Sequence, residues 1–278
     1  MDYKIIVDSC GELTEEMKKD GHYETVSLMM EVSGHHIKDD ETFNQKEFIK
    51  LVAESEECPK SSCPSPEEYL ESYKGADRVY VVTLSAELSG SYNSAQLGKN
   101  LYFEEEDEKN IHVFNSKTAS VGQTLIALKI KECEDKGMSF DEVVATVEDY
   151  IEGQNTHFVL ENIDTLKKNG RLTGIKALVA TALNIKPVLC STKEGTIDQF
   201  DKARGIKKAL VKLVDGAIND AENTKEKILG IANCNCPERA SEVKELLLSK
   251  AEFKDVVIVD TAGISTMYAN DGGIIVVI

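Results

Sequence analysis

The chain has 278 residues, of which 41% are hydrophobic and 29% charged, and its formal net charge at pH 7 is −17. This length is sufficient for two domains, and this composition is typical of globular proteins. The negative charge argues against binding to a nucleic-acid backbone or to an anionic membrane surface. No apolar run approaches the roughly 18 residues of a transmembrane helix, so no integral membrane segment is predicted.

The cysteines and the first residues indicate a cytoplasmic protein. Seven cysteines are an odd number without the spacing of a disulfide framework, which predicts free thiols in a reducing compartment. The start of the chain is too short and too acidic for a signal peptide and is predicted to be the first strand. Cys234 and Cys236 form a C-x-C pair without a second pair, and His35 and His36 lack a partner at metal-ligand spacing. No metal site is therefore predicted.

The first half of the chain repeats the order strand, polar turn, helix. Its predicted strands are apolar and rich in β-branched residues, and each leads into a turn of small polar side chains. The strands are predicted at 4–7, 79–82 and 110–114, and the turns at 8–9, 85–91 and 115–120. This order is typical of a parallel sheet, which binds ligands beyond the carboxyl ends of its strands. We therefore predict an α/β protein whose N-terminal, Rossmann-like domain spans 1–153 and brings the three turns together.

Other elements of this half follow local signals. A strand pair is predicted at 24–32 and 36–38, around the Ser33-Gly34 turn. The segment 58–66 holds three prolines and is predicted to be a loop, because proline interrupts helices and central strands. Helices are predicted at 15–19, 41–54, 67–73, 94–98, 119–134 and 140–152.

The second half mixes hairpin and crossover connections. This mixture indicates a two-layer α/β sandwich, predicted to span 154–278. Its strands are predicted at 157–161, 185–191, 196–202, 227–233, 255–260 and 273–278. Its helices are predicted at 163–169, 174–183, 206–219 and 237–250.

Several hydroxyl residues and one arginine are candidates for binding an anion. The turn Ser89-Gly90-Ser91 joins a strand to a helix, where free backbone N–H groups and the helix dipole attract negative charge. Because serine is a common helix cap, a purely structural role for this turn stays open. Ser61 and Ser62 lie in the proline-bounded loop. Arg171 follows a helix-ending glycine and suits bidentate recognition of a carboxylate or phosphate, with a surface salt bridge as the alternative.

Nucleophilic catalysis has weaker support in the sequence. Cys10 follows the first strand close to a helix start, where a thiolate would be stabilised. No histidine can be paired with it from the sequence, and a small buried apolar role is the simpler interpretation. The glycine motifs of dinucleotide sites and P-loops and the nucleophile elbow of hydrolases are absent from the sequence.

Taken together, six segments resemble the motifs of the bacterial DegV family in order and spacing. They are VDS at 7–9, SSCPS at 61–65, LSGSYNSA at 88–95, SVGQ at 120–123, NGR at 169–171 and LNIKP at 183–187. The resemblance covers nearly the whole chain, and its most specific parts are the LSGSY and NIKP segments. It implies the two-domain EDD fold of a fatty-acid-binding protein, with the acyl chain in a tunnel and the carboxylate held between the domains. Related members present the fatty acid to a separate kinase, which makes an acyl phosphate.

The resemblance also implies roles for individual residues. Ser61 takes the place of the family's usual threonine as a carboxylate donor. Ser89 is the second hydroxyl donor, with the backbone of Gly90 and Ser91 beside it, and Arg171 lies near the head group, on the ligand or on the partner face. The apolar helix predicted at 174–183 is equally suited to lining the tunnel or filling a core. No cofactor is implied besides the bound fatty acid.

One motif departs from the family pattern. Many members carry a His-Thr-Gly-Pro-Gly-like segment near the C-terminus, where this chain has Tyr268-Ala269-Asn270-Asp271-Gly272. The role of the family's histidine is therefore not carried over. The Tyr268 hydroxyl can still donate a hydrogen bond to a head group.

Three functions compete for this set of residues. The first is a carrier that binds a long-chain fatty acid and presents it to a kinase subunit. The second is an acyl- or phosphoryl-transfer enzyme that uses Ser89 or Cys10 in the same cleft, with Asp8 as the nearest candidate base. The third is a sensor that reports a bound lipid to a protein partner. The resemblance favours the carrier.

Overall fold

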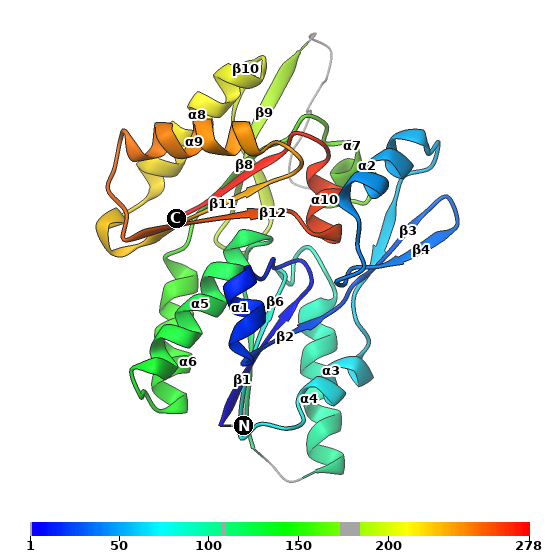
Figure 1. Cartoon of the computed structure of the whole chain (residues 1–278), viewed down its shortest axis with the longest axis vertical. Helices are drawn as coiled ribbons and strands as arrows, with labels where there is room; N and C mark the ends of the chain where they lie inside the picture. The colour runs from blue at the N-terminus through cyan, green and yellow to red at the C-terminus, as the bar shows by residue number, and fades with distance from the viewer. Residues whose placement is uncertain (1, 107–108, 173–183) are drawn as a thin grey trace.

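The computed structural model of the chain describes residues 2–106, 109–172 and 184–278. The two halves of the sequence form two lobes that pack against each other (Figure 1). The helix expected at 174–183 lies outside the described residues. Within the described ranges, no helix is both long and apolar enough to cross a membrane.

The N-terminal lobe contains a four-stranded parallel sheet with the strand order β2-β1-β6-β7. Its strands are β1 (Tyr3–Asp8), β2 (Tyr23–Val26), β6 (Arg78–Thr83) and β7 (Asn110–Asn115). Residues 79–82 of β6 are fully buried, as expected for a strand that is covered on both faces. The predicted parallel sheet is therefore confirmed.

Helices cover both faces of this sheet. One face packs against α1 (Glu15–Asp20), α5 (Val121–Asp135) and α6 (Phe140–Glu152). The other packs against α3 (Pro66–Ser72) and α4 (Ser91–Glu105). Successive β6 side chains alternate between these layers, since Tyr80 and Val82 belong to the first and Val79 and Val81 to the second.

A small antiparallel sheet corrects two sequence predictions. It consists of β3 (Met29–Val32), β4 (His35–Lys38) and β5 (Lys60–Ser62), beside α2 (Gln45–Glu54). The strand predicted at 24–32 is two strands, because β2 joins the main sheet and β3 begins the small one. The segment expected to be a loop contributes β5, which pairs with β3. Pro59 and Pro64 flank β5 without interrupting it, so its three N–H groups stay available.

The C-terminal lobe contains a six-stranded mixed sheet with the order β10-β9-β8-β13-β11-β12. Its strands are β8 (Thr156–Val159), β9 (Ile185–Ser191), β10 (Ile197–Arg204), β11 (Ile228–Asn233), β12 (Asp255–Asp260) and β13 (Ile274–Val277). The helices α8 (Ile206–Asp220) and α9 (Pro237–Leu248) pack on one face, and α7 (Asp164–Lys168) and the short 3-10 helix Thr224–Glu226 lie in the connections. The expected mixed α/β architecture is confirmed.

The other face of this sheet turns toward the N-terminal lobe. Val121 and Leu125 of α5 pack against Ala232, Val259 and Val277 in one apolar cluster. The turn between β9 and β10 adds a second contact, because the Ser85 hydroxyl donates to the carbonyl oxygen of Gly195 at 2.7 Å. The two lobes are therefore joined by apolar packing and by a buried hydrogen bond.

A further helix, α10 (Gly263–Ala269), has no counterpart among the sequence predictions. Six of its seven residues are buried, so it lacks the polar face on which helical periodicity depends. Its first N–H groups are capped from the other lobe. Asp39 accepts hydrogen bonds from Gly263 N at 2.6 Å and Ile264 N at 2.9 Å, and Glu12 accepts one from Ala262 N at 3.3 Å.

Gly195 offers a test of how the lobes fit together. Its φ of +89° is unfavourable for other residues, and an added Cβ would lie 2.4 Å from Ser85 Oγ and 2.9 Å from Lys117 Cα. We expect Gly195→Ala to lower the free energy of unfolding by about 1–3 kcal/mol more than Gly137→Ala. Gly137 is the matched control, because its φ is +72° and nothing lies within 4 Å of an added Cβ. Equal losses in urea unfolding would contradict the proposed close contact.

Glu12 should make the stability depend on pH. Burial raises its pKa from 4.5 to about 7, so between these values the folded state holds a proton that the unfolded state releases. The free energy of unfolding should therefore fall by roughly 1–3 kcal/mol as pH rises from about 4.5 to 7. Glu12→Gln should remove this part of the slope, measured by urea unfolding across the range. The exposed Glu15→Gln is the control, and an identical slope in all three proteins would refute the assignment.

Candidate functional site

Asp8 joins the ends of β1 and β6 to the first turns of α4 and α5. This carboxylate is fully buried at the carboxyl end of β1. One oxygen accepts from Leu84 N and Ser91 Oγ, both at 2.7 Å, and the other from Gln123 Nε2 at 2.9 Å and Cys10 N at 3.2 Å. Burial raises the pKa of Asp8, and these four hydrogen bonds act in the opposite direction. Hydrogen bonds to Asp8 thus hold together the segments that carry or adjoin the three predicted turns.

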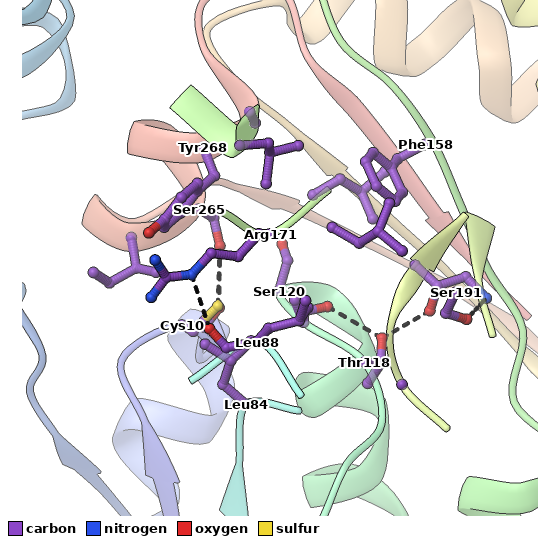
Figure 2. Close-up of a pocket in the computed structure, with 18 of the residues that line it drawn as sticks. Cys10, Leu84, Leu88, Thr118, Ser120, Phe158, Arg171, Ser191, Ser265 and Tyr268 are labelled. Atoms are coloured by element: carbon purple, nitrogen blue, oxygen red, sulfur yellow. Dashed lines mark hydrogen bonds between the residues drawn. The ribbon is translucent and has the colours of Figure 1, made fainter. Parts of the chain in front are cut away.

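A cavity lies between these turns and the C-terminal sheet (Figure 2). Its empty space, including the solvent at its open mouth, is about 750 Å³. Most of its walls are apolar side chains from both lobes. They include Leu84, Leu88, Phe158, Leu160, Leu166, Ile197, Ile264 and Ile275.

Arg171 and Tyr268 form one end of the cavity. The Arg171 guanidinium carbon lies 5.9 Å from the centre of the Tyr268 ring, close enough for a cation–π contact. Arg171 Nε donates to Leu88 O at 3.1 Å, and Nη1 donates to Asn169 O. In the described part of the chain, Nη2 has no hydrogen-bond partner. This leaves both N–H groups of Nη2 available at this end of the cavity.

Local structure explains how these two side chains reach the site. Helix α7 ends just before Gly170, whose φ of +72° reverses the chain, and Arg171 N donates back to Leu166 O at 2.9 Å. Tyr268 lies on α10, which the other lobe caps. Its hydroxyl lies 3.2 Å from Ser61 Oγ, although these residues are 207 positions apart. Burial raises the pKa of Tyr268, so its hydroxyl stays protonated at neutral pH.

The remaining predicted residues lie around this end in different situations. Ser89 follows a wall residue of the cavity, and its Oγ accepts from Ser91 N at 3.2 Å. Gly90 is packed against the loop that holds Ser61, since an added Cβ would lie 3.2 Å from Cys63 Sγ. The Ser91 hydroxyl is occupied by Asp8 and by the Tyr69 hydroxyl, each at 2.7 Å.

Ser62 is exposed. It follows Ser61 on β5, so its side chain points to the opposite face of the small sheet.

The cavity also contains polar residues that the sequence did not single out. Ser265 Oγ donates to Cys10 O at 3.1 Å and lies 3.9 Å from Cys10 Sγ. Burial raises the pKa of the Cys10 thiol well above its ordinary value, which disfavours a thiolate nucleophile. Thr118, Thr156 and Ser191 also line the cavity. Among the described residues, no group of three or more His, Cys, Asp or Glu side chains could hold a metal ion.

Comparisons with known proteins agree over the full length of the chain. Residues 2–278 match the model of the DegV family, described as an uncharacterised protein family. A DegV domain-containing protein of Streptococcus pyogenes serotype M3 is 35% identical over 283 aligned positions, which cover 99% of this chain and 98% of the relative.

Solved structures extend this similarity to the fold. A DegV family protein from Ruminococcus gnavus, whose structure contains vaccenic acid, is 62% identical with a TM-score of 0.98 and 99% coverage of both chains. The Fatty Acid Kinase (Fak) B3 protein of Streptococcus pneumoniae, loaded with linoleic acid, is 31% identical with a TM-score of 0.90. That match covers 100% of this chain and 99% of the other. With the family model matched almost end to end and its fold shared, this chain is a member of the DegV family.

Proposed function

We propose that the protein binds a long-chain fatty acid, with the carboxylate at the Arg171–Tyr268 end of the cavity and the acyl chain along its apolar walls. One observation carries this proposal. A single cavity combines extended apolar walls with Arg171 and Tyr268 at one end, and the Tyr268 hydroxyl is hydrogen-bonded to Ser61 beside the cavity. Apolar walls with polar donors at one end are what an amphipathic acid requires. The structures of the similar DegV family protein with vaccenic acid and of the similar Fak B3 protein with linoleic acid support the same ligand class.

The two parts of such a ligand contribute differently. Burying a dozen methylenes is worth on the order of 10 kcal/mol before ordering costs, at ~0.8 kcal/mol each. The carboxylate loses its hydration on binding, and the net charge of −17 on the protein repels it. Local hydrogen-bond donors therefore have to compensate both effects. The apolar walls therefore supply most of the affinity, and the donors fix the orientation.

The proposed donors keep protons that no acceptor in the described part of the protein uses. Of the two protons on the Ser61 and Tyr268 hydroxyls, one lies between them, and the other is free to meet a carboxylate. The Ser89 hydroxyl accepts from Ser91 N, so its own proton is a further donor. Arg171 Nη2 adds charge. Ser62 and the hydroxyl of Ser91 have no part in this arrangement, because one faces solvent and the other is bound to Asp8.

The two lobes contribute different parts of the proposed binding site. We assign the head-group loops mainly to a domain of residues 1–153 and the roof of the acyl tunnel to a domain of residues 154–278, with Arg171 and Tyr268 reaching across from the second domain. The seven free thiols support a cytoplasmic location.

Presentation of the fatty acid to a separate kinase is the proposed biological role. The similarity to a protein described as part of a fatty acid kinase supports it. A carrier role also agrees with the chemistry of the cavity better than acyl transfer by Cys10 does, since the raised thiol pKa leaves little thiolate at neutral pH. Addition of a DegV-dependent fatty acid kinase and ATP should convert the bound acid to acyl phosphate.

The first experiment is mass spectrometry of lipid extracted from the purified protein. We expect a long-chain fatty acid in near-stoichiometric amount, and displacement of that acid by added oleic acid. A protein that purifies without lipid and fails to bind oleic acid in calorimetry would contradict the binding function. Turnover of an acyl ester without a kinase would instead support the enzyme.

Neighbouring serines on β5 test the position of the carboxylate. Ser61→Ala removes a donor and leaves the Tyr268 hydroxyl without its partner, so the Kd for oleic acid should rise about 5- to 30-fold. Ser62→Ala is the matched control on the outer face and should change the Kd less than about twofold. Both are measured by displacement of a fluorescent fatty acid. If the two variants bind equally well, the carboxylate lies elsewhere.

A further inference from the structure

Hydroxyl side chains line the mainly apolar cavity at the end away from Arg171 as well. Figure 2 shows Thr118 and Ser191 on the side of the cavity opposite Arg171 and Tyr268, with Phe158 on the wall above. Thr118 and Ser191, together with Thr156, form a group that we name the distal hydroxyl cluster. In the proposed orientation of a fatty acid, the carboxylate lies at the Arg171 end. The far end of the chain then lies toward this cluster.

Hydrogen bonds hold the cluster together but leave one donor unused. Thr118 Oγ1 lies 2.7 Å from Thr156 Oγ1 and donates weakly to Ala119 O at 3.4 Å. Ser191 Oγ accepts from Thr156 N at 3.3 Å. Among the residues that the structure describes, no acceptor meets the Ser191 hydroxyl proton. That proton is therefore available to a ligand or to water.

The backbone fixes the cluster in place. On β8, Thr156 faces the cavity with Phe158, whereas Val159 faces α8, as alternation along a strand requires. Thr156 and Thr118 are 6% and 5% exposed, so neither side chain can turn out to bulk water. The start of α5 packs directly on Thr118, because a Cβ at Gly122 would lie 2.3 Å from Thr118 Oγ1.

Behind the cluster lies a second, more polar hollow. Thr118 and Ser191 line both the cavity and this hollow, whose other residues include Gln154 and Lys193. The cluster is thus the partition between the tunnel and a polar surface recess. A polar chain end at the partition would lie close to solvated groups.

These contacts discriminate between kinds of chain end. Ser191 is half-buried. A methyl group beside the cluster offers no acceptor to its hydroxyl and displaces water from the cavity side of it, which is unfavourable for a donor that is partly shielded from solvent. A hydroxyl at the same position accepts from Ser191, and it donates to a free lone pair of Thr118 or Thr156. A site with such polar groups favours the oxygen-bearing member of a matched pair of ligands.

We propose that the distal hydroxyl cluster makes this protein accept fatty acids that carry a hydroxyl group toward the far end of the chain. The inference rests on the proposed fatty-acid-binding function and narrows its ligand class. Thr156 and Ser191 are the specificity-determining residues, and they act at the end of the cavity opposite the carboxylate donors. Unsubstituted acids still bind through the apolar walls.

The test compares each saturated fatty acid from dodecanoic to octadecanoic acid with its ω-hydroxy derivative. Kd values come from displacement of a fluorescent fatty acid. At the chain length that reaches the cluster, the wild-type protein should bind the ω-hydroxy acid at least as tightly as the parent acid. In the Thr156→Val/Ser191→Ala variant, the Kd of the ω-hydroxy acid should rise about tenfold, the factor that corresponds to 1.4 kcal/mol, while that of the parent acid stays the same or falls.

Ser265→Ala is the control. It removes a cavity hydroxyl that already donates to Cys10 O, so the ratio of the two Kd values should not change. The inference is overturned if the wild-type protein binds every ω-hydroxy acid about tenfold more weakly than its parent, or if the double variant changes both Kd values equally. In either case binding of the parent acids still supports the proposed function. If no parent acid binds, the proposed function falls and the inference falls with it.

Discussion

The buried carboxylate of Asp8 is the constraint around which the site is arranged. Its four hydrogen bonds join the ends of β1 and β6 to the start of α5. The three turns that form the floor of the cavity are therefore held in fixed positions relative to one another. Without the carboxylate, two backbone N–H groups and two side-chain donors would lose their acceptor in a dry environment, which is costly. Ser91 and Gln123 therefore hold the floor of the site in place by binding Asp8. Neighbouring residues such as Leu84 and Leu88 form the surface that faces the cavity.

The roof of the cavity depends on two further carboxylates. Asp39 and Glu12 extend from the N-terminal lobe to the first turn of α10, and α10 carries both Ser265 and Tyr268 into the cavity wall. The hydroxyl pair of Ser61 and Tyr268 exists only because this helix is held against the small sheet. The proposed head-group end is consequently a joint product of both lobes, and any movement between them would change it.

Sequence patterns predicted elements well where local signals and burial agree. The strand at 79–82 appears as a continuous apolar run because helices cover both faces of its sheet. Two elements were missed for identifiable reasons. Strand β5 has only three residues between prolines and depends on pairing with β3. Helix α10 is buried almost all round, so no polar face marks it as a helix, and its cap comes from residues more than 200 positions away.

The sequence by itself determined the family, the α/β class and the candidate residues Ser61, Ser89, Arg171 and Tyr268, because these depend on local motifs and on the period of apolar residues. Only the tertiary structure decided which of their polar atoms are free. Hydrogen-bond partners from distant segments occupy the Ser91 hydroxyl and leave protons on the Ser61–Tyr268 pair and on Arg171. Alternation along β5 places Ser62 on the face opposite Ser61. The distal hydroxyl cluster likewise comes from one turn and two strands. The proximity of its three residues arises from sheet order and the contact between lobes, which a linear pattern of residues does not record.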